Sequence, residues 1–561
     1  MAEATSAHKS DGADQVPLSD LRSFYQTGEE VVVAALPPGC SCVLARHAQG
    51  DVVAVQVSGQ ANLGPLPPGT YCIEAVSPEG SLLAEDFTTI GAHPGERPVH
   101  GFATSFQAED VAATLSWLRA LRCTVVQVYD WMQTYSDPLG PAKGWCDPSG
   151  RPVSFEALCT LAAGIRSQGA VAHAYAPVYA VDLPFAAAHP ELLMYRSDGA
   201  PERLFDSIQL VNPANPDWQR HFTTTYGAAA DAIGFNGFHI DTYGFPRAAV
   251  DNRGQDIDVR AGYEAFLEFF RAKRPSDLVS FNQVNGVPSA LRLGGEPQFR
   301  YCEVWAPNDR WRHLEGLMDR SSGRAGHPAV GGNQAEAMRG TIACYPPVWG
   351  RKDAESPVEG EARQASLRTV ILTEAIATCL GAGSLLYGDM AAVLFDPYYP
   401  KHERLLGPEV ETVLAWHRFA LRCRDLFIDA EDTSWYEIGD ENGAVAVSWE
   451  GPVSPEPIGG AVFARVACSP GLIGVGLLDL TGSANGSWSE PTGPGSCQLA
   501  RVRVLLEAPE HWEAAAAVLG RSGGRFAPLP FSVVEHREGL AAQVDVPLDA
   551  GWSVLRLRRK I

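Results

Sequence analysis

The chain has 561 residues, of which 45% are hydrophobic, and its 44 Lys and Arg against 66 Asp and Glu give a formal net charge of -22. A chain of this length and composition can fold into several domains with sizeable cores, which excludes a disordered or fibrous protein. Because basic residues form no run beyond the last few positions, we also exclude nucleic acid and anionic membranes as expected partners.

The N-terminal residues contain no apolar stretch of signal-peptide length, and no uninterrupted apolar run is long enough to span a bilayer. The 12 cysteines are scattered, apart from Cys40 and Cys42, without a CxxC pair or metal-ligand spacing. We therefore expect mostly reduced and buried thiols, no metal, no cofactor and a cytoplasmic location. The sequence does not predict the oligomeric state.

The first domain is expected at residues 1–95. Between residues 27 and 90 the chain alternates short apolar runs (EVVVAAL, CSCVLARH, VVAVQV and TYCIEAV) with Gly-containing turns. Runs of period two between such turns are typical of antiparallel strands. This pattern predicts a small β-sandwich of the immunoglobulin-like type.

The second domain is expected at residues 96–430, where strands alternate with longer helical stretches such as AEDVAATLSWLRALR. Eight strand candidates follow in order: VHGFATS, TVVQVYDW, AVAHAYAP, GFHID, LVSFNQ, YCEVW, PAVGGNQ and SLLYGD. Eight such units predict an α/β fold of the (β/α)8 TIM-barrel type, whose active site lies at the carboxyl ends of the strands. A doubly wound open sheet gives similar alternation, but the chain lacks GxGxxG after the first strand and a Walker P-loop.

The third domain is expected at residues 431–561, where short alternating strands return as WYEIG, AVAVSW, AVFARVA, GVGLLDL, RVRVLL and WSVLRLR. This pattern predicts a second, C-terminal β-sandwich. The barrel is therefore expected to be flanked by a β-sandwich on each side.

Two acids stand out because each ends an apolar strand of the predicted barrel. Asp241 closes the run GFHID and enters a Thr-Tyr-Gly turn, and Glu303 lies among aromatic and apolar neighbours in FRYCEVW. Acids at strand ends also cap helices or pair with basic residues, so neither is diagnostic alone. Together they are typical of glycoside hydrolysis, which needs one protonated carboxyl group and one ionised carboxylate.

Several segments carry a resemblance to a known family. VVQVYDWMQTYSDPLG, LVNPANPDWQRHF, GFNGFHIDTYG, YCEVW and DPYYPKHERLL are similar to segments of glycoside hydrolase family 66, the dextranases and cycloisomaltooligosaccharide glucanotransferases. The resemblance covers roughly residues 98–427. It implies that Asp241 is the nucleophile and Glu303 the general acid/base of a retaining enzyme acting on α-1,6-linked glucan.

Further residues near predicted strand ends are candidates for binding the sugar chain. They are Asp130, Trp131, His239, Tyr243, Gln283, Trp305, Gln334 and Asp389. Each has a structural alternative: Trp131 as a core indole beside a helix-capping Asp130, His239 as a core histidine, and the two glutamines as partners of buried backbone groups.

The sequence departs from the family at the eighth strand, where GAGSLLYGDM replaces an acidic, His-containing stretch. It also lacks the long carbohydrate-binding insertion typical of the cyclising members. We therefore expect hydrolysis of dextran or, for an enzyme inside the cell, of isomaltooligosaccharides. The alternatives are a transglucosylase, which shares the covalent intermediate, and a non-catalytic carbohydrate-binding barrel protein.

Overall fold

The computed structural model describes residues 18–244, 248–288, 298–322, 340–346, 358–395, 402–431 and 443–560. Its centre is an 8-stranded parallel sheet in the order β22-β21-β20-β19-β16-β12-β9-β8. The outer strands β8 and β22 also lie against each other, so the sheet closes into a barrel. The predicted (β/α)8 fold is confirmed.

The barrel strands follow the chain in sheet order. They are β8 (His100–Ala103), β9 (Val125–Val128), β12 (Val171–Pro177), β16 (Gly237–Asp241), β19 (Leu278–Asn282), β20 (Gln298–Glu303), β21 (Gly340–Ala343) and β22 (Gly383–Leu385). All of them except β21 overlap the segments predicted from the sequence. The segment predicted as the seventh strand, PAVGGNQ, lies outside the described residues, and the seventh strand of the barrel is β21. A Cβ on Gly340 would approach the backbone oxygen of Arg300 to 2.9 Å, so β21 needs a glycine to lie close to β20.

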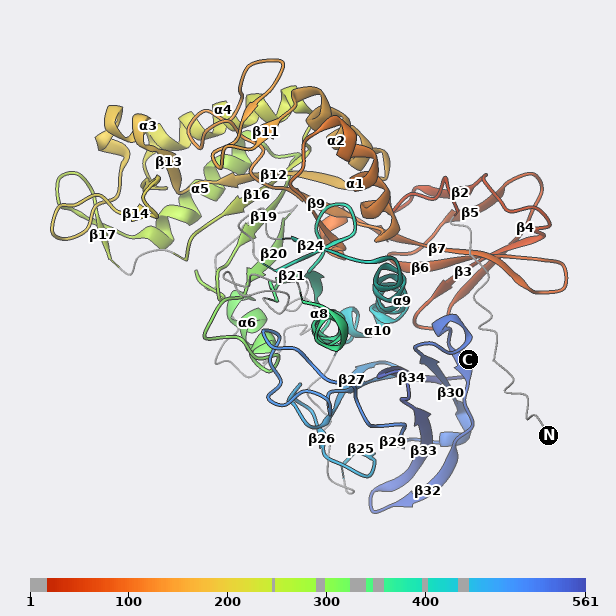
Figure 1. Ribbon diagram of the computed structural model, residues 1–561. Coiled ribbons are helices and arrows are strands. Elements are labelled where there is room, and N and C mark those ends of the chain that lie inside the picture. Colours follow the sequence, from red (N-terminus) through yellow and green to blue (C-terminus); the bar gives the residue numbers. More distant parts are fainter. Residues whose placement is uncertain are drawn as a thin grey trace.

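Helices cover the outside of the barrel (Figure 1). They are α1 (Ala108–Ala120), α2 (Phe155–Ser167), α4 (Pro216–Ile233), α5 (Val259–Lys273), α6 (His313–Ser322), α8 (Gly360–Cys379), α9 (Gly407–Cys423) and the short α10 (Asp425–Ile428). The helix before the fourth strand illustrates how the sequence sets these bounds. Asn215 caps the amide of Asp217 at 2.9 Å, Pro216 opens α4, and Gly234 ends it with φ +93°.

Smaller elements extend from the loops of the barrel. The largest excursion, between β12 and α4, contains β13 (Ala180–Asp182), α3 (Leu183–Ala188), β14 (Arg203–Leu204) and β15 (Ile208–Leu210), with the three strands paired as β13-β15-β14. The other additions are the hairpins β10 (Trp145–Cys146) with β11 (Pro152–Val153), β17 (Ala249–Val250) with β18 (Asp256–Ile257), and β23 (Ala392–Leu394) with β24 (His402–Arg404).

A β domain precedes the barrel. It pairs β1 (Phe24–Gln26), β7 (Leu82–Gly91), β6 (Gly69–Val76), β3 (Cys42–His47) and β4 (Val52–Gln56) in one sheet, and β2 (Glu30–Val33) with β5 (Ala61–Pro65) in another. Its own core is built from the alternate side chains of these strands, such as Val43, Ala45, Ile73 and Ala75.

A second β domain follows the barrel. One sheet orders β25 (Val445–Ser448), β29 (Leu499–Leu506), β33 (Gly539–Pro547) and β32 (Ser532–His536). The other orders β26 (Val453–Ser454), β27 (Val462–Ser469), β28 (Leu472–Asp479), β34 (Trp552–Arg559), β30 (Trp512–Val518) and β31 (Ala527–Pro528). The predicted strand WYEIG lies outside the described residues, and the exact domain boundaries stay a prediction.

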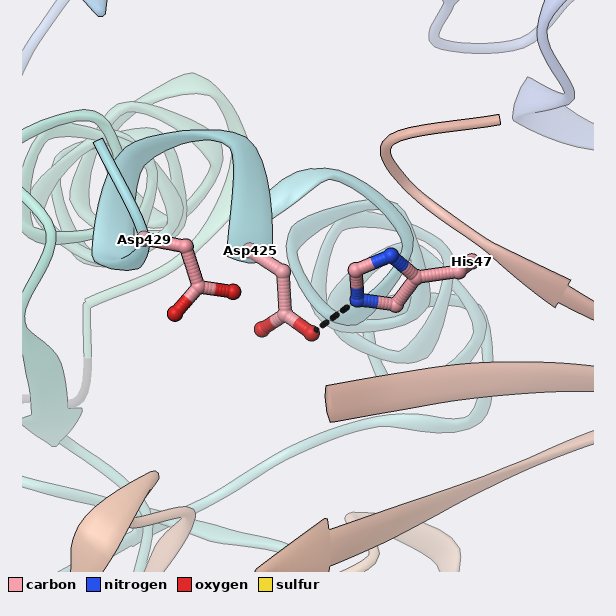
Figure 2. A group of neighbouring side chains, drawn as sticks. All are labelled: His47, Asp425 and Asp429. Atoms are coloured by element: carbon pink, nitrogen blue, oxygen red, sulfur yellow. Dashed lines mark hydrogen bonds and ion pairs between the residues drawn. The ribbon is translucent and has the colours of Figure 1, made fainter. Parts of the chain in front are cut away.

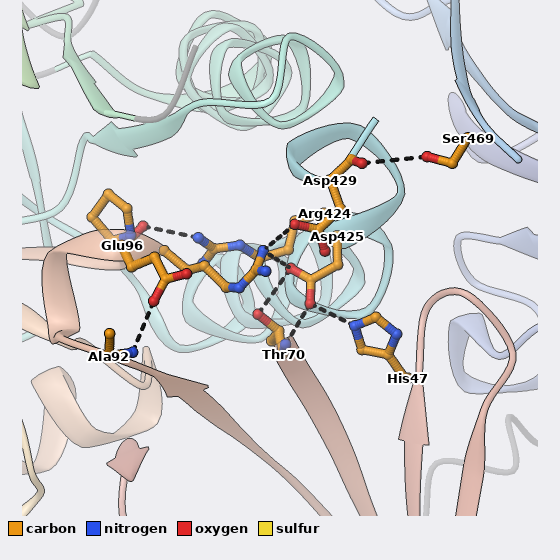
Figure 3. A network of polar contacts seen from close by, with 10 residues as sticks. His47, Thr70, Ala92, Glu96, Arg424, Asp425, Asp429 and Ser469 are labelled. Carbon is orange, nitrogen blue, oxygen red and sulfur yellow. Dashed lines mark hydrogen bonds and ion pairs between the residues drawn. The ribbon is translucent and has the colours of Figure 1, made fainter. Parts of the chain in front are cut away.

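In Figure 1 the N-terminal β domain lies to the right of the barrel and the C-terminal β domain below it; β6 contacts α9, and β28 contacts α8 and α10. Figure 2 shows His47 of β3 pointing at Asp425 of α10, with Asp429 beside it. His47 Nε2 lies 2.9 Å from Asp425 Oδ2, and Thr70 Oγ1 donates to the same carboxylate. Figure 3 shows the wider network of polar contacts around Asp425, which includes Thr70 of β6 and Glu96 of the segment before β8.

His47, Asp425 and Asp429 place a nitrogen and two carboxylates close enough to hold a metal ion. However, Arg97 lies 3.7 Å from Asp425 and 2.7 Å from Asp429, so a guanidinium already compensates both acids. Asp425 is fully buried, and Arg97, His47 and Arg424 hold its pKa well below the usual range. This group links the N-terminal β domain to the end of the barrel.

All twelve cysteines are free thiols, and most of them are buried. The predicted reduced state of the cysteines is therefore consistent with their packing. Within the described part of the chain, we find no helix that is both long and apolar enough to cross a bilayer.

Candidate active site

Asp241 is the last residue of β16, and its carboxylate faces the inside of the barrel. The strand can run close to its neighbours because Gly237 has no side chain: a Cβ there would lie 2.7 Å from the carbonyl oxygen of Leu278. Tyr175 donates to Asp241 Oδ2 at 2.6 Å, and Tyr179 approaches the same oxygen at 3.5 Å. Only 8% of Asp241 is exposed, so this carboxylate is held in a buried and polar setting.

Glu303 ends β20, two strands away from β16 in the sheet. Its neighbours include Tyr301 and Tyr345, whose hydroxyls lie 3.2 Å apart, and Trp305, whose ring centroid is 5.9 Å from that of Tyr345. The backbone N–H of Trp305 is fixed by the side chain of Asn285 at 2.8 Å. Aromatic groups therefore surround this second carboxyl group.

Asn282 joins the two acids. It ends β19, the strand between β16 and β20, and its side-chain amide donates to Asp241 Oδ1 at 2.7 Å and to Glu303 Oε2 at 2.8 Å. Because one nitrogen reaches both oxygens, these oxygens are no farther apart than two hydrogen bonds laid end to end. Asp241 and Glu303 thus face each other across a single site.

The surroundings of the two acids raise both pKa values. Burial raises the pKa of Asp241 to about 6, although hydrogen bonds from Tyr175, Asn282 and the backbone act in the opposite direction. Burial and the charge of Asp241 raise the pKa of Glu303 to about 7, against the hydrogen bond from Asn282. Asp241 accepts more hydrogen bonds than Glu303 and is therefore the easier of the two acids to ionise.

A cavity opens over this pair. Its wall is formed mainly by side chains that project inward from the ends of the barrel strands: Gln127, Tyr129, Tyr175, Tyr179, Leu204, His239, Asp241, Thr242, Tyr243, Asn282, Val284, Tyr301, Glu303, Trp305 and Tyr345. Carboxylates, an amide and many aromatic rings therefore converge on one space. Such a mixture of stacking surfaces and hydrogen-bonding groups is well suited to a sugar.

Residues 79–555 match Glycosyl hydrolase family 66, which is most of the chain. The chain belongs to glycosyl hydrolase family 66. This finding confirms the resemblance that the strand segments predicted. It also agrees with the pair of carboxyl groups at the carboxyl ends of the barrel strands.

Two proteins with related names are similar to this family 66 chain. A cycloisomaltooligosaccharide glucanotransferase of Niallia circulans is 23% identical over 278 residues, which cover 44% of this chain and 28% of that protein. A cycloisomaltooligosaccharide glucanotransferase of Paenibacillus sp., solved with cycloisomaltoheptaose, has a TM-score of 0.75 at 16% identity and covers 95% of this chain and 98% of its own. The structural likeness shows that the two chains share a fold.

A weaker structural likeness links the chain to a maltogenic α-amylase of Thermotoga neapolitana, with a TM-score of 0.49 at 9% identity over 81% of this chain and 97% of the amylase. It adds nothing to the assignment within family 66.

The structure places three of the predicted sugar-binding residues in the cavity wall: His239, Tyr243 and Trp305. His239 is nearly fully buried and contacts Ser280 Oγ at 2.9 Å through Nδ1. Burial holds the pKa of His239 well below its usual value, so the imidazole is neutral. Tyr243 differs, because its buried hydroxyl has no hydrogen-bond partner among the described residues.

Other predicted residues need correction. Trp131 is 0% exposed and donates its indole N–H to the carbonyl oxygen of Tyr175 at 3.1 Å, so it cannot stack on a sugar. Gln283 lies outside the cavity wall and binds the carbonyl oxygen of Pro288 at 2.8 Å. Both residues follow the structural alternative, in which side chains of this kind fill the core or satisfy the backbone.

Asp130 and Asp389 also lie outside the cavity wall. Asp130 is buried 3.9 Å from the guanidinium of Arg151, and Asp389 accepts hydrogen bonds from the backbone and the hydroxyl of Thr104. Burial raises the pKa of Asp130 to about 7 and that of Asp389 to about 6. These two acids therefore connect loops of the barrel. The remaining predicted residue, Gln334, lies outside the described residues.

Further residues of the cavity wall were not predicted from the sequence: Asn282, Tyr129, Tyr175, Tyr179 and Tyr345. A signal for Asn282 was present, because it is the last residue of an apolar strand in the same position as Asp241 and Glu303. The tyrosines carried no such signal, since aromatic residues are common on the buried faces of strands.

Proposed function

We propose that this family 66 protein is a glycosidase that hydrolyses α-1,6-glucosidic linkages of dextran or isomaltooligosaccharides with retention of configuration. The observation that carries the proposal is the bridge of Asn282 between Asp241 and Glu303. It brings two carboxyl groups of different acidity to one cavity. The names of the similar proteins support α-1,6-linked glucose chains as the substrate class.

The spacing of the acids supports retention. Carboxyl groups of retaining glycosidases are about 5 to 5.5 Å apart, whereas inverting enzymes leave a wider gap for a water molecule. The oxygens of Asp241 and Glu303 that share the amide of Asn282 cannot be farther apart than the upper end of the shorter range, because they lie 2.7 and 2.8 Å from the same nitrogen. A direct attack by Asp241 fits this geometry better than an attack by water between the acids.

In the proposed reaction Asp241 attacks the anomeric carbon while Glu303 transfers its proton to the leaving glycosidic oxygen. The bond to the leaving sugar breaks, and an ester between Asp241 and the remaining sugar forms. Glu303, now ionised, takes a proton from a water molecule as that water attacks the anomeric carbon. The ester then breaks, which restores the carboxylate of Asp241 and the protonated Glu303.

The wall supplies groups that can hold the sugar. The hydroxyl of Tyr243 and the Oδ1 atom of Asn282 have no hydrogen-bond partner among the described residues, and both line the cavity. A buried polar atom without a partner is costly, so a sugar hydroxyl at either atom gains a full hydrogen bond. Trp305 and Tyr345 offer flat surfaces beside Glu303 for the faces of the pyranose rings.

Incubation with isomaltooligosaccharides of defined length, followed by chromatography of the products, tests the proposal. We expect shorter oligosaccharides and no products from α-1,4-linked maltooligosaccharides of equal length. The anomeric form of the first product, followed by NMR, is expected to match that of the substrate. Unchanged isomaltooligosaccharides would refute the proposed activity, and an inverted product would refute the covalent step.

A transglucosylase is the second candidate, favoured by the glucanotransferase names of the two similar proteins. It forms the same ester on Asp241 but passes the sugar to another sugar instead of to water. The same incubations separate the two activities, because transfer produces longer or cyclic products. Hydrolysis ranks first here because the barrel sequence lacks a long carbohydrate-binding insertion.

The pH dependence of kcat/KM is expected to be a narrow bell. The acid limb reports ionisation of Asp241, with a pKa of about 6, and the alkaline limb reports loss of the proton from Glu303, with a pKa of about 7. Activity therefore peaks between these values and falls on both sides. A plateau extending to pH 9 would contradict Glu303 as the acid.

Replacement of Asn282 tests the bridge as a positioning device. The amide of Asn282 lowers the pKa of both acids, so Asn282→Ala is expected to move both limbs of the bell to higher pH. Loss of hydrogen bonds to charged groups, each worth about 1.5–3 kcal/mol, is expected to reduce kcat by roughly tenfold to a hundredfold. Asn62→Ala is a matched control, because Asn62 donates to Glu30 at 3.0 Å on the surface. A lower kcat with unmoved limbs would argue against the bridge.

A further inference from the structure

A second cavity, of about 200 Å³, lies where the N-terminal β domain, α9 and the C-terminal β domain meet. It shares no lining residue with the cavity over Asp241 and Glu303. The polar part of its wall consists of four guanidinium groups, from Arg46, Arg422, Arg525 and Arg556, together with the imidazole of His47. None of the described lining residues is an acid, which is unusual in a chain with a net charge of -22.

Two glutamates behind the wall compensate part of this positive charge. Arg46 lies 2.7 Å from Glu74, Arg422 lies 2.6 Å from Glu85, and Arg525 lies 3.2 Å from Glu74. Three of the four guanidinium groups therefore share two carboxylates, and with Arg556 the four arginines exceed these two glutamates by two positive charges. His47 is left out of this count of charges, because its ring pairs with Asp425 (Figure 3).

Arg556 carries the clearest part of the excess. It donates to the carbonyl oxygen of Ala48 at 2.9 Å and lies 4.5 Å above the ring of Phe526, but it makes no ion pair with a described carboxylate. Burial and the neighbouring Arg558 lower the pKa of Arg556, and the more weakly acting Glu513 and Asp51 offset only part of this effect. Since Arg556 is half-buried and pairs directly with no described carboxylate, an anion in the cavity stabilises this side chain.

Arg422 provides a second, independent indication. This residue of α9 is only 7% exposed, and its Nε–H has no hydrogen-bond partner in the part of the chain that the structure describes. The backbone also approaches the guanidinium groups closely at Gly50, where φ is +107° and a Cβ would lie 2.7 Å from Arg558 Nη1. Side chains from the N-terminal β domain, α9 and the C-terminal β domain thus line one space.

We propose that this cavity is a binding site for a phosphate group, either free inorganic phosphate or the phosphate of a small phosphorylated metabolite. The two excess positive charges match the charge of about -1.5 to -2 that a phosphate group carries at pH 7. Planar guanidinium groups bind its oxygens in pairs, and the cavity is far larger than the roughly 10–15 Å³ that a water molecule needs. The proposal is independent of the glycosidase activity.

The site can be tested without disturbing the core, because Val52 lines the cavity and is 48% exposed. Val52→Glu places a carboxylate at the cavity wall, on the edge strand β4. Val533→Glu is the matched control: Val533 is 49% exposed and lies on β32, the edge strand of another sheet. The two variants have the same charge and a nearly equal change in exposed surface.

Isothermal titration of the full chain with inorganic phosphate and with glucose 6-phosphate, at constant ionic strength in chloride, measures binding. We expect one site in the wild type and in Val533→Glu, and affinity at least about tenfold weaker in Val52→Glu. Arg556→Gln is expected to weaken binding further, with circular dichroism as the check of its fold. Tighter binding of glucose 6-phosphate than of phosphate identifies a phosphorylated metabolite, and equal or weaker binding identifies the free anion. Absence of saturable binding, or equal affinity of the wild type and Val52→Glu, overturns the proposal.

Discussion

Asp241→Asn is expected to lower kcat on isomaltooligosaccharides by roughly four orders of magnitude or more, as removal of a covalent nucleophile does in other enzymes. The amide has almost the shape of the carboxylate but cannot attack the anomeric carbon. We expect the fold to persist and the melting temperature to stay equal or rise, because the variant removes a buried charge whose pKa is raised by burial.

The measurement combines steady-state rates with the mass of the intact protein after a quenched reaction with an activated glucosyl fluoride. The wild type is expected to carry a sugar on Asp241, and the variant none. Asp198→Asn, a change at an exposed aspartate, serves as the control and should keep normal rates. Normal turnover by Asp241→Asn, once deamidation back to Asp is excluded by peptide mass, would overturn the assignment of the nucleophile.

Glu303→Gln is expected to lose about 10²- to 10⁴-fold in kcat on substrates with a sugar leaving group, which is the usual contribution of general acid–base catalysis. The loss should be much smaller for the first step with a glucosyl fluoride, because fluoride leaves without a proton. The variant then accumulates the sugar ester on Asp241, since no base remains to activate water.

Azide distinguishes the two variants. As a nucleophile that needs no deprotonation, it should release the sugar from Glu303→Gln and restore turnover of the glucosyl fluoride. In Asp241→Asn no sugar ester is expected at residue 241, with or without azide. Glu109→Gln on α1 is a surface control of the same chemistry. An equal loss on both kinds of substrate, without rescue by azide, would remove Glu303 from the role of acid/base.

Alternation along the strands explains why the sequence predicts the acids but not their partners. Side chains at positions i and i+2 share one face of a strand, so Asp241 points inward with His239, and Glu303 points inward with Tyr301. An acid at the end of an apolar run is conspicuous even when the register is unknown. The two carboxyl groups could therefore be identified from the sequence.

The same alternation explains the errors at neighbouring positions. On β19 the inward position belongs to Asn282, and Gln283 is one residue beyond it and turns to the backbone. A one-residue shift of this kind moves a side chain to the opposite face, and a single sequence does not define the register closely enough to exclude it. After β9 the left-handed conformation of Asp130, with φ +49°, ends the alternation, so the chain buries Trp131 beneath β12.

The fold could be predicted almost completely, because strand–helix alternation and period-two runs are properties of long segments. The cavity of four arginines could not be predicted, since these arginines come from β3, α9, β34 and the segment before β31. No local pattern connects segments so far apart in the sequence. Long-range packing, which the sequence pattern does not encode locally, decides that part of the molecule.

The excursion between β12 and α4 contributes to the shape of the cavity but not to the groups proposed to react. The groups proposed to perform the chemistry, Asp241, Asn282 and Glu303, end strands of the rigid barrel, whereas Leu204 reaches the cavity from β14 of the excursion. Insertions or exchanges in this segment can reshape the cavity while the strand ends stay in place. Changes in this segment are therefore expected to alter which sugar chain the cavity accepts, while Asp241, Asn282 and Glu303 keep their places.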